Sequence, residues 1–270
     1  MEHLSPLRRG WEPALRELVG SASERLFISS PYITAFGCDL VGDSCSETLE
    51  DGGEVAVLTD LSPMPICQGA TDPAALRTLA NRGHSLVIRH LPRLHAKVYI
   101  SDERAAIVTS GNLTAGGLIQ NYEYGFRISD AAVVRAIRSD VSSYSTLGAE
   151  VTDSQLAAFC EIAVEMRVAF RQSQASITRA IRRRFDAIVR EAEDELIRLR
   201  LAGGAMHTVF ARTIMYLLQR HGPLTTLEIH ARVEAIHPDL CDNSVDRVID
   251  GKRFGKKWKH AVRTAQQQLK

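Results

Sequence analysis

The chain has 270 residues, a formal net charge of +1, and a composition that is 45% hydrophobic and 6% aromatic. This length and composition exclude a disordered or collagen-like chain and suit one large or two modest domains with ordinary cores. The near-zero net charge neither favours nor excludes a nucleic-acid partner until the charges are placed along the chain.

The cysteines and the apolar segments limit the cellular setting. Five cysteines are scattered without a CxxC pair or a Cys/His ligand spacing, so we expect free thiols and no structural zinc. The first residues lack the apolar core of a signal peptide, and no apolar run approaches the roughly 20 residues of a membrane helix. We therefore expect a cytoplasmic protein that uses no membrane, metal ion or cofactor.

Short apolar, β-branched segments predict strands in the first half of the chain. These segments are 25–33 (RLFISSPYI), 54–60 (EVAVLTD), 84–91 (HSLVIRHL), 95–100 (HAKVYI), 105–110 (AAIVTS) and 122–129 (YEYGFRIS). Strand patterns alternate here with helix patterns, which predicts an α/β domain with a mixed sheet over residues 1–150.

Two helices of this domain have recognisable ends. The Asp72 carboxylate can cap the first, Pro73 suits its first turn, and Gly83 can close it. Asp130 can cap the second, which we expect to run to about Ile137.

Residues 151–204 read as a charged helical segment. Its apolar residues fall near one stripe of the predicted helix: Ile177, Ile181, Phe185, Ile188, Leu196 and Leu199. Two interpretations stay open: an amphipathic helix packed on its own domain, or an arm between chains or domains. Gly203 and Gly204 would end the segment as a hinge.

Residues 205–270 are basic, with eleven Lys and Arg against six Asp and Glu. A first helix is expected to close at Gly222, a second to start at Thr225 or Thr226 and stop before Pro238, and a basic third to cover residues 254–270. This organisation resembles a winged-helix or helix-turn-helix module, with Trp258 as a partly buried anchor.

The last part of this module carries a run of cations. Six bases occur without an acid: Lys252, Arg253, Lys256, Lys257, Lys259 and Arg263. We expect them to contact DNA phosphates through the third helix. A solvated basic helix on an ordinary small domain is the alternative.

Polar side chains flank two neighbouring strand-like segments near the middle of the chain. If residues 103–104 form a hairpin turn, His95 lies opposite Asn112 and Lys97 opposite Ser110. Side chains two apart on a strand share a face with the residues directly opposite them. All four groups would then converge on one patch.

Such a patch suits a phosphodiester. Lys97 supplies positive charge, while Asn112 and Ser110 can donate hydrogen bonds to the non-bridging oxygens. A neutral His95 can attack phosphorus through a ring nitrogen.

The same residues carry a resemblance to a known family. The pattern is His95-x-Lys97-(x)4-Asp102-(x)6-Thr109-Ser110-x-Asn112. It resembles the HKD motif of the phospholipase D superfamily, with Thr109 where the family usually has Gly. Asp102 lies beside the hairpin turn, so we interpret it as structural.

The resemblance extends over roughly residues 20–145. The segment GLIQNYEYG is similar to the one in which family nucleases place a Glu that orients the nucleophile. That residue would be Glu123, which either orients His95 or pairs with a neighbouring base.

The resemblance implies a phospholipase D-like mixed sheet flanked by helices and a mechanism with two histidines. One histidine forms a phosphohistidine and the other protonates the leaving oxygen. None of the other eight histidines is followed by x-Lys, so we expect the second half-site from another copy, in a homodimer with one composite active site.

The domain organisation favours DNA as the substrate. We expect a catalytic domain over 1–150, a helical linker or arm over 151–204 and a DNA-binding domain over 205–270. The implied function is a metal-independent nuclease similar to the restriction-endonuclease branch of the family, with further subunits of a defence system as possible partners. The alternatives are a phospholipid hydrolase or transphosphatidylase, and a non-catalytic DNA-binding subunit of a defence complex.

Overall fold

The structure, a computed structural model, describes residues 3–80, 85–175, 179–202 and 205–269. The chain divides into two compact units, Met1–Ala192 and Glu193–Lys270. The functional boundaries expected near residues 150 and 204 stay a prediction. Four residues to which the sequence assigns a role lie outside the described residues: Gly83, Ile177, Gly203 and Gly204.

In the described part of the first unit, eight strands form one mixed sheet. They are β1 (Leu4–Leu7), β2 (Arg25–Ser29), β3 (Glu54–Thr59), β4 (Ser85–His90), β5 (Lys97–Ser101), β6 (Ala105–Thr109), β7 (Gly125–Ile128) and β8 (Ala149–Val151). Their order across the sheet is β1-β7-β6-β5-β2-β3-β4-β8. β3 pairs in parallel with β2 and β4, and the other neighbours are antiparallel. The mixed sheet expected from the sequence is confirmed, whereas the edge strands β1 and β8 were not predicted.

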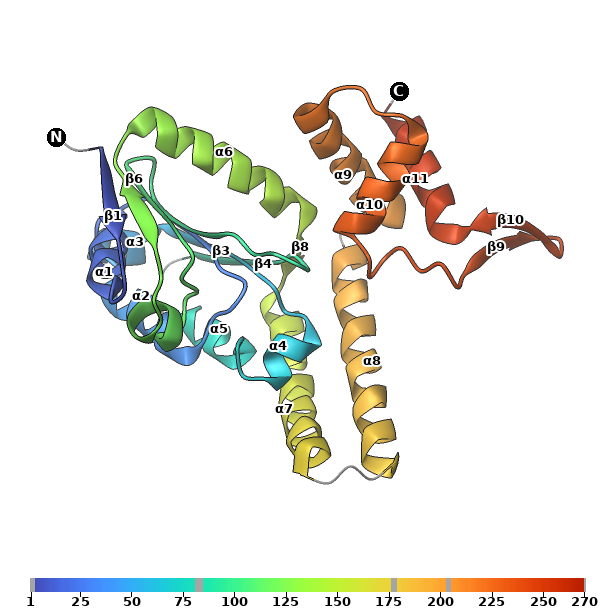
Figure 1. The fold of residues 1–270 in the computed structure, drawn as a ribbon, viewed down its shortest axis with the longest axis horizontal. Helices are drawn as coiled ribbons and strands as arrows, with labels where there is room; N and C mark the ends of the chain where they lie inside the picture. The colour runs from blue at the N-terminus through green and yellow to red at the C-terminus, as the bar shows by residue number, and fades with distance from the viewer. Residues whose placement is uncertain (1–2, 81–84, 176–178, 203–204, 270) are drawn as a thin grey trace. The chain divides into compact units, whose positions relative to one another are not determined.

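Helices cover both faces of this sheet. They are α1 (Glu12–Gly20), α2 (Ala35–Ser44), α3 (Glu47–Glu50), α4 (Pro63–Cys67), α5 (Pro73–Leu79), the π-helix η1 (Gly116–Gln120), α6 (Ala131–Leu147) and α7 (Asp153–Ala175). Figure 1 shows α6 on one side of the sheet and α5 on the other. The two-sided cover explains why β2 and β3 are almost continuously apolar and buried instead of alternating.

The helix starts in this unit follow their capping residues. The Asp72 carboxylate accepts a hydrogen bond from the amide of Ala74, and Asp130 caps α6 in the same way. The expected end of α6 near residue 137 was wrong. The helix continues to Leu147 because Val141 and Leu147 extend its buried face, and no glycine or proline interrupts it before Gly148.

The charged segment after α6 is helical, as predicted, and consists of α7 and α8 (Arg179–Ala202). Helix α7 packs against α4 and α5. The ring of Phe185 on α8 lies 5.6 Å from that of Phe170 on α7, measured between centroids, so the first half of α8 packs on α7. Within the described residues, no helix is both long and apolar enough to span a membrane. The five cysteines, all described, are free thiols as expected.

In its described part, the second unit contains the end of α8, three further helices and a hairpin. The further helices and the hairpin strands are α9 (Met206–His221), α10 (Thr226–Ile236), β9 (Asp246–Ile249), β10 (Lys252–Lys256) and α11 (Lys257–Gln268). Trp258 and Val262 of α11 are buried against Phe210 of α9 and Val233 of α10. The expected helix ends are confirmed, because Gly222 closes α9 and Thr225 forms a capping box at the start of α10.

The expected start of the last helix at residue 254 was wrong. Residues 254–256 instead belong to β10, which pairs with β9 in a hairpin. Asp250 and Gly251 form the turn, both with positive φ (48° and 74°), as a tight two-residue turn requires. The module therefore presents a β-ribbon before its basic helix.

Candidate active site

The motif residues lie at one end of three neighbouring strands. Lys97 is the first residue of β5, Ser110 directly follows β6, and Glu123 precedes β7 by two residues. Lys97 pairs with Thr109, and Thr109 pairs with Gly125, so these three strand ends lie side by side. The sheet thus gathers a base, a hydroxyl and a carboxylate at one end.

The hairpin register differs by one residue from the register expected. Lys97 lies opposite Thr109 and not opposite Ser110. His95 precedes β5 and Asn112 follows β6, so neither is a strand residue. The direct cross-strand pairings expected for these side chains were therefore wrong, and the loops rather than the strand pleat position His95 and Asn112.

The turn explains this shift. It spans residues 102–104, because Ser101 pairs with Ala105 and the Arg104 amide donates to the Ser101 carbonyl at 3.1 Å. Asp102, the first residue of this turn, adopts a left-handed φ of 51°. The expected two-residue turn at 103–104 was wrong for this reason.

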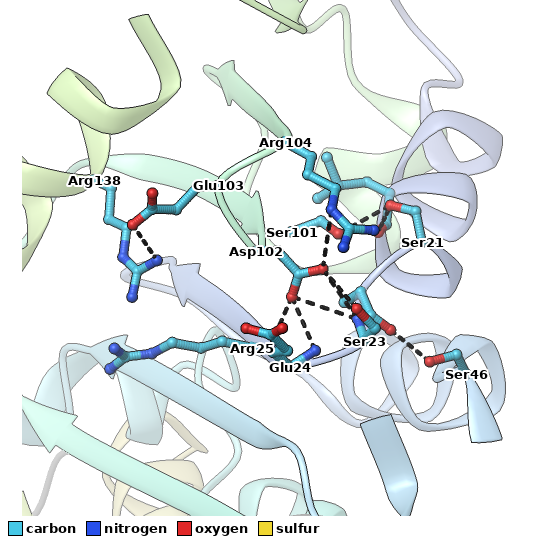
Figure 2. A network of polar contacts seen from close by, with 12 residues as sticks. Ser21, Ser23, Glu24, Arg25, Ser46, Ser101, Asp102, Glu103, Arg104 and Arg138 are labelled. Atoms are coloured by element: carbon cyan, nitrogen blue, oxygen red, sulfur yellow. Dashed lines mark hydrogen bonds and ion pairs between the residues drawn. The ribbon is translucent and has the colours of Figure 1, made fainter. Parts of the chain in front are cut away.

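Asp102 ties this turn to the start of β2 (Figure 2). Its carboxylate accepts hydrogen bonds from the amides of Glu24 (3.0 Å) and Arg25 (2.9 Å), and from the hydroxyl and amide of Ser23. Its own amide donates to the Arg25 carbonyl at 2.8 Å. Burial raises the pKa of Asp102, but the hydrogen bonds from the Arg25, Glu24 and Ser23 amides outweigh it and hold the pKa below 3.8. These contacts support the structural interpretation of Asp102.

His95 and Lys97 contact each other directly. The Lys97 Nζ atom lies 2.9 Å from His95 Nε2. Because an ammonium group has only donors, Nε2 is the acceptor and carries the lone pair. His95 is exposed, whereas Lys97 is 6% exposed. Burial lowers the pKa of Lys97, and the negative charge of Glu123 opposes that effect.

Ser110 and Glu123 form a second pair. The Ser110 hydroxyl donates to Glu123 Oε2, and the Tyr124 amide donates to the Ser110 oxygen at 3.1 Å. The side-chain amide of Asn121 donates to Glu123 Oε1 at 3.2 Å. With its proton directed at Glu123, Ser110 must rotate before it can donate to a phosphate oxygen. The negative charge of Glu123 also acts on Lys97. This effect is part of what the second interpretation of Glu123, pairing with a neighbouring basic residue, expects.

Two aromatic residues, Tyr99 and Trp11, hold the loop that carries Asn112 through hydrogen bonds to its backbone. Tyr99 donates to the Gly111 carbonyl at 3.2 Å, and Trp11 Nε1 donates to the Gly117 carbonyl at 2.7 Å. Burial raises the pKa of Tyr99, so its hydroxyl keeps the proton that it donates. A Cβ at Gly117 would lie 2.4 Å from the Asn112 carbonyl oxygen, so only glycine allows this approach.

Asn112 itself has an unusual environment. Its Oδ1 is buried and has no hydrogen-bond partner among the residues that the structure describes. A buried polar atom without a partner costs free energy and is rare in native structures, and a catalytic role is one of the reasons for which such an atom is retained.

Thr109, the departure from the family motif, is accommodated by the strand beside it. Its hydroxyl donates to the Tyr124 carbonyl at 3.3 Å and accepts from the Gly111 amide at 3.2 Å. Directly opposite is Gly125, where a Cβ would lie 2.6 Å from the Thr109 Cβ. The missing side chain at Gly125 leaves the room that Thr109 needs.

A buried polar pair holds the loop that carries His95. The Arg93 amide donates to Asp60 at 2.9 Å, and the Leu61 amide donates to His90 Nδ1 at 3.0 Å. Asp60 directly follows β3, and His90 is the last residue of β4, the parallel neighbour of β3. Sequence reasoning missed these residues and also Trp11 and Tyr99, because their partners are distant in the chain.

The six cations expected to bind DNA are divided between two elements. Lys252, Arg253 and Lys256 belong to β10 rather than to the last helix, and Lys257, Lys259 and Arg263 belong to α11. Three of these six cations have internal partners. Lys256 pairs with Asp246 at 2.7 Å, Arg253 pairs with Asp246 at 3.6 Å, and the Lys259 ammonium lies 5.3 Å from the centroid of the Trp258 ring. The side chains of Lys252, Lys257 and Arg263 are exposed.

A comparison with protein families matches part of the first unit. Residues 15–144 match the family model described as "Cardiolipin synthase, PLD-like domain". A comparison with curated proteins gave no match.

Three solved structures illustrate the likeness. The phospholipase D family member Nuc from Salmonella typhimurium is 18% identical, with a TM-score of 0.45, and the match covers 54% of this chain and 97% of that one. NucT from Helicobacter pylori is 15% identical, with a TM-score of 0.40 and coverage of 50% and 91%. A phosphatidylserine synthase from Haemophilus influenzae is 19% identical, with a TM-score of 0.43 and coverage of 53% and 38%.

The family model spans the strand ends, the clamped loop and every motif residue from His95 to Glu123. The mixed sheet flanked by helices has the architecture that the motif implied. Residues 15–144 of this chain are similar to a phospholipase D-like domain.

Proposed function

We propose that this chain is a metal-independent phosphodiesterase that cleaves DNA through a phosphohistidine on His95. One observation carries the proposal: an exposed His95 whose Nε2 accepts from Lys97 at 2.9 Å, inside a phospholipase D-like domain. The Lys97 contact leaves Nε2 with the lone pair that a nucleophile needs.

The reaction consists of two displacements at phosphorus. His95 Nε2 attacks, an Nε2–P bond forms and the P–O bond to the leaving group breaks. The leaving oxygen takes a proton from a second histidine. That histidine then accepts a proton from water, and the resulting hydroxide displaces His95 and restores its lone pair. Lys97 and Asn112 would stabilise the charge on the non-bridging oxygens in both steps.

The second histidine would be His95 of another copy of the chain. The sequence contains one motif, and the remaining histidines lack the following x-Lys. A two-fold symmetric dimer brings two equivalent residues together across its axis. The exposure of His95 supports this arrangement, because a residue that meets its own copy must lie on the surface.

DNA is the phosphodiester that the second unit favours. Its helices and hairpin resemble a winged-helix module, and exposed Lys252, Lys257 and Arg263 offer charge to phosphates. Exposed cations on a β-ribbon and on a helix suit groove and backbone contacts. The module would bind DNA, and the phospholipase D-like domain would cleave it. Further subunits of a defence system would be consistent with this organisation.

A phospholipid is the second candidate substrate. The observation in its favour is that the matching family model is described as cardiolipin synthase. A lipid-directed enzyme would hydrolyse or transfer the headgroup of vesicle phospholipids and would be indifferent to DNA.

The test uses plasmid DNA and phosphatidylglycerol vesicles, each incubated with the full chain in excess EDTA. We expect the plasmid to be cut, the lipid to stay intact, and His95→Ala to abolish cutting. His3→Ala is the matched control, because this exposed histidine directly precedes β1 and lies outside the motif.

Each other outcome would redirect the assignment. Strict dependence on added metal would contradict the phosphohistidine mechanism. Lipid turnover without DNA cutting would assign the second candidate. DNA binding without cutting would leave a non-catalytic DNA-binding subunit.

A further inference from the structure

Exposed aromatic side chains flank Glu123. Tyr122 is 88% exposed and Tyr124 is 54% exposed, and Ile119 near the end of η1 is 42% exposed. All three lie within the short segment between Asn112 and β7. The segment that carries Glu123 therefore exposes large side chains that the hydrolytic steps do not use.

Tyr122 is held in place although most of its surface is open. The Arg9 guanidinium lies 4.9 Å from the centroid of the Tyr122 ring, and Arg9 Nη1 donates to the Tyr122 hydroxyl at 3.4 Å. Arg9 comes from the connection between β1 and α1, more than a hundred residues earlier. A cation over one ring face leaves the other face open to solvent. The result is an aromatic ring that Arg9 contacts and that stays largely exposed.

The neighbouring ring is positioned as well. The Tyr124 ring meets the Phe126 ring edge-on, with centroids 5.6 Å apart and an interplanar angle of 86°. Its backbone is fixed by two hydrogen bonds with Ser110, one in each direction. In the sequence, Tyr122 and Tyr124 thus flank a carboxylate that accepts a hydrogen bond from the motif serine.

We propose that Tyr122 is a stacking platform for an unpaired nucleobase of the substrate strand, beside the scissile phosphate. This assignment rests on the proposed DNA phosphodiesterase function. Aromatic faces stack on any base, and a cation next to the ring adds attraction for the backbone. Only one residue step, about 3.8 Å between Cα atoms, separates Tyr122 from Glu123.

The platform specifies a substrate class. A base inside an intact duplex has both faces covered by its neighbours, so it cannot stack on Tyr122 without leaving the helix. The enzyme should therefore prefer single strands, or duplex positions at which one base is extruded. A lipid headgroup offers no flat π surface to the open ring face.

The experiment compares two oligonucleotides of equal length: oligo-dT, and an abasic strand with the same phosphates but no bases. Binding is measured in EDTA with full-length His95→Ala protein, so that no strand is cut. We expect oligo-dT to bind about 5- to 150-fold more tightly than the abasic strand, the range for stacking of one base. Adding Tyr122→Ala should remove this preference, and adding Tyr122→Phe should retain it.

Val164→Ala is the control, since Val164 on α7 is 61% exposed and lies outside the motif segment. It should leave the base preference unchanged. The mass of each variant in solution is measured in parallel.

Several results would overturn the assignment of Tyr122 as a stacking platform. Equal affinity for both strands, or a preference that Tyr122→Ala leaves intact, would remove Tyr122 from substrate binding. A loss of the dimer in Tyr122→Ala would assign the ring to a subunit interface. DNA cutting by the wild type without a base preference would contradict only the stacking role of Tyr122. Absence of any DNA binding or cutting would contradict both that role and the proposed function.

Discussion

The ammonium of Lys97 lies 2.9 Å from Nε2 of His95, and only the imidazole of the two is exposed. A buried cation beside an exposed acceptor orients the imidazole and leaves it reachable from outside. The Lys97 ammonium can move from His95 Nε2 to a phosphate oxygen when a phosphodiester approaches, because the ring nitrogen and the phosphate oxygen are both hydrogen-bond acceptors. The contact therefore links the resting geometry to the proposed attack.

The activity should fall at high pH as Lys97 loses its charge, and this alkaline limb of the pH profile should lie at a lower pH than a typical lysine would give. Burial lowers the pKa of Lys97 below the ordinary 10.5, so its cation is lost at a lower pH than that of a typical lysine. As pH rises through this lowered pKa, the charge on the phosphate loses its partner and kcat falls. The pH profile of kcat on an oligonucleotide measures the limb.

Lys97→Arg provides the control for this assignment. Arginine stays charged throughout the range, so whatever activity the variant retains should lack the early limb. An unchanged limb in Lys97→Arg would assign it to another group.

Asn112→Ala should lower turnover much more than binding. Asn112 is expected to donate to a non-bridging oxygen as charge develops there, and loss of one such donor costs about 10²–10³ in kcat. Steady-state cleavage gives kcat, and binding of uncut DNA in the His95→Ala background gives affinity. Gln120→Ala, an exposed amide on η1, is the matched control. A loss confined to affinity would contradict the role.

Asp102→Ala should destabilise the fold by about 1–3 kcal/mol, because the amide and hydroxyl donors at the start of β2 lose their shared acceptor. The folded pKa of Asp102 lies below 3.8, so its contribution is present above pH 3.8 and is lost as pH falls through the folded value. Urea unfolding of the wild type and the variant should differ at pH 7 and converge in acid. Asp140→Ala, an exposed acid on α6, should show no such difference. A pH-independent difference would rule out the carboxylate as its source.

The salt dependence of DNA binding should distinguish Lys257 from Lys256. Lys257 is exposed, whereas Lys256 is paired with Asp246 at 2.7 Å. Each cation that contacts a phosphate adds about 0.9 to the slope of log affinity against log salt. Lys257→Ala should lower the slope by about that amount, and Lys256→Ala by less. Affinities over a salt series measure both slopes, and equal slopes for both variants would contradict the distinction.

The sequence predicted what depends on local pattern. The central strands and the caps at Asp72 and Thr225 were anticipated from neighbouring residues. The hairpin register was not, because the left-handed Asp102 is stabilised by amides near Arg25, far away in the chain.

Two other misses have different causes. The clamp between Trp11 and Gly117 joins residues 106 positions apart and leaves no local pattern. The β9–β10 hairpin did have a signal, since Asp250-Gly251 between β-branched and basic residues is a turn sequence. The run of cations after it was interpreted as one helix, and that interpretation hid the turn.

The most direct test of the mechanism is the intact mass of the enzyme quenched during turnover of an oligonucleotide. We predict a covalent phosphate adduct on the wild type that is labile in acid, that peptide mapping places on His95, and that His95→Ala lacks. Steady cleavage with no adduct, or an adduct on another residue, would contradict the account.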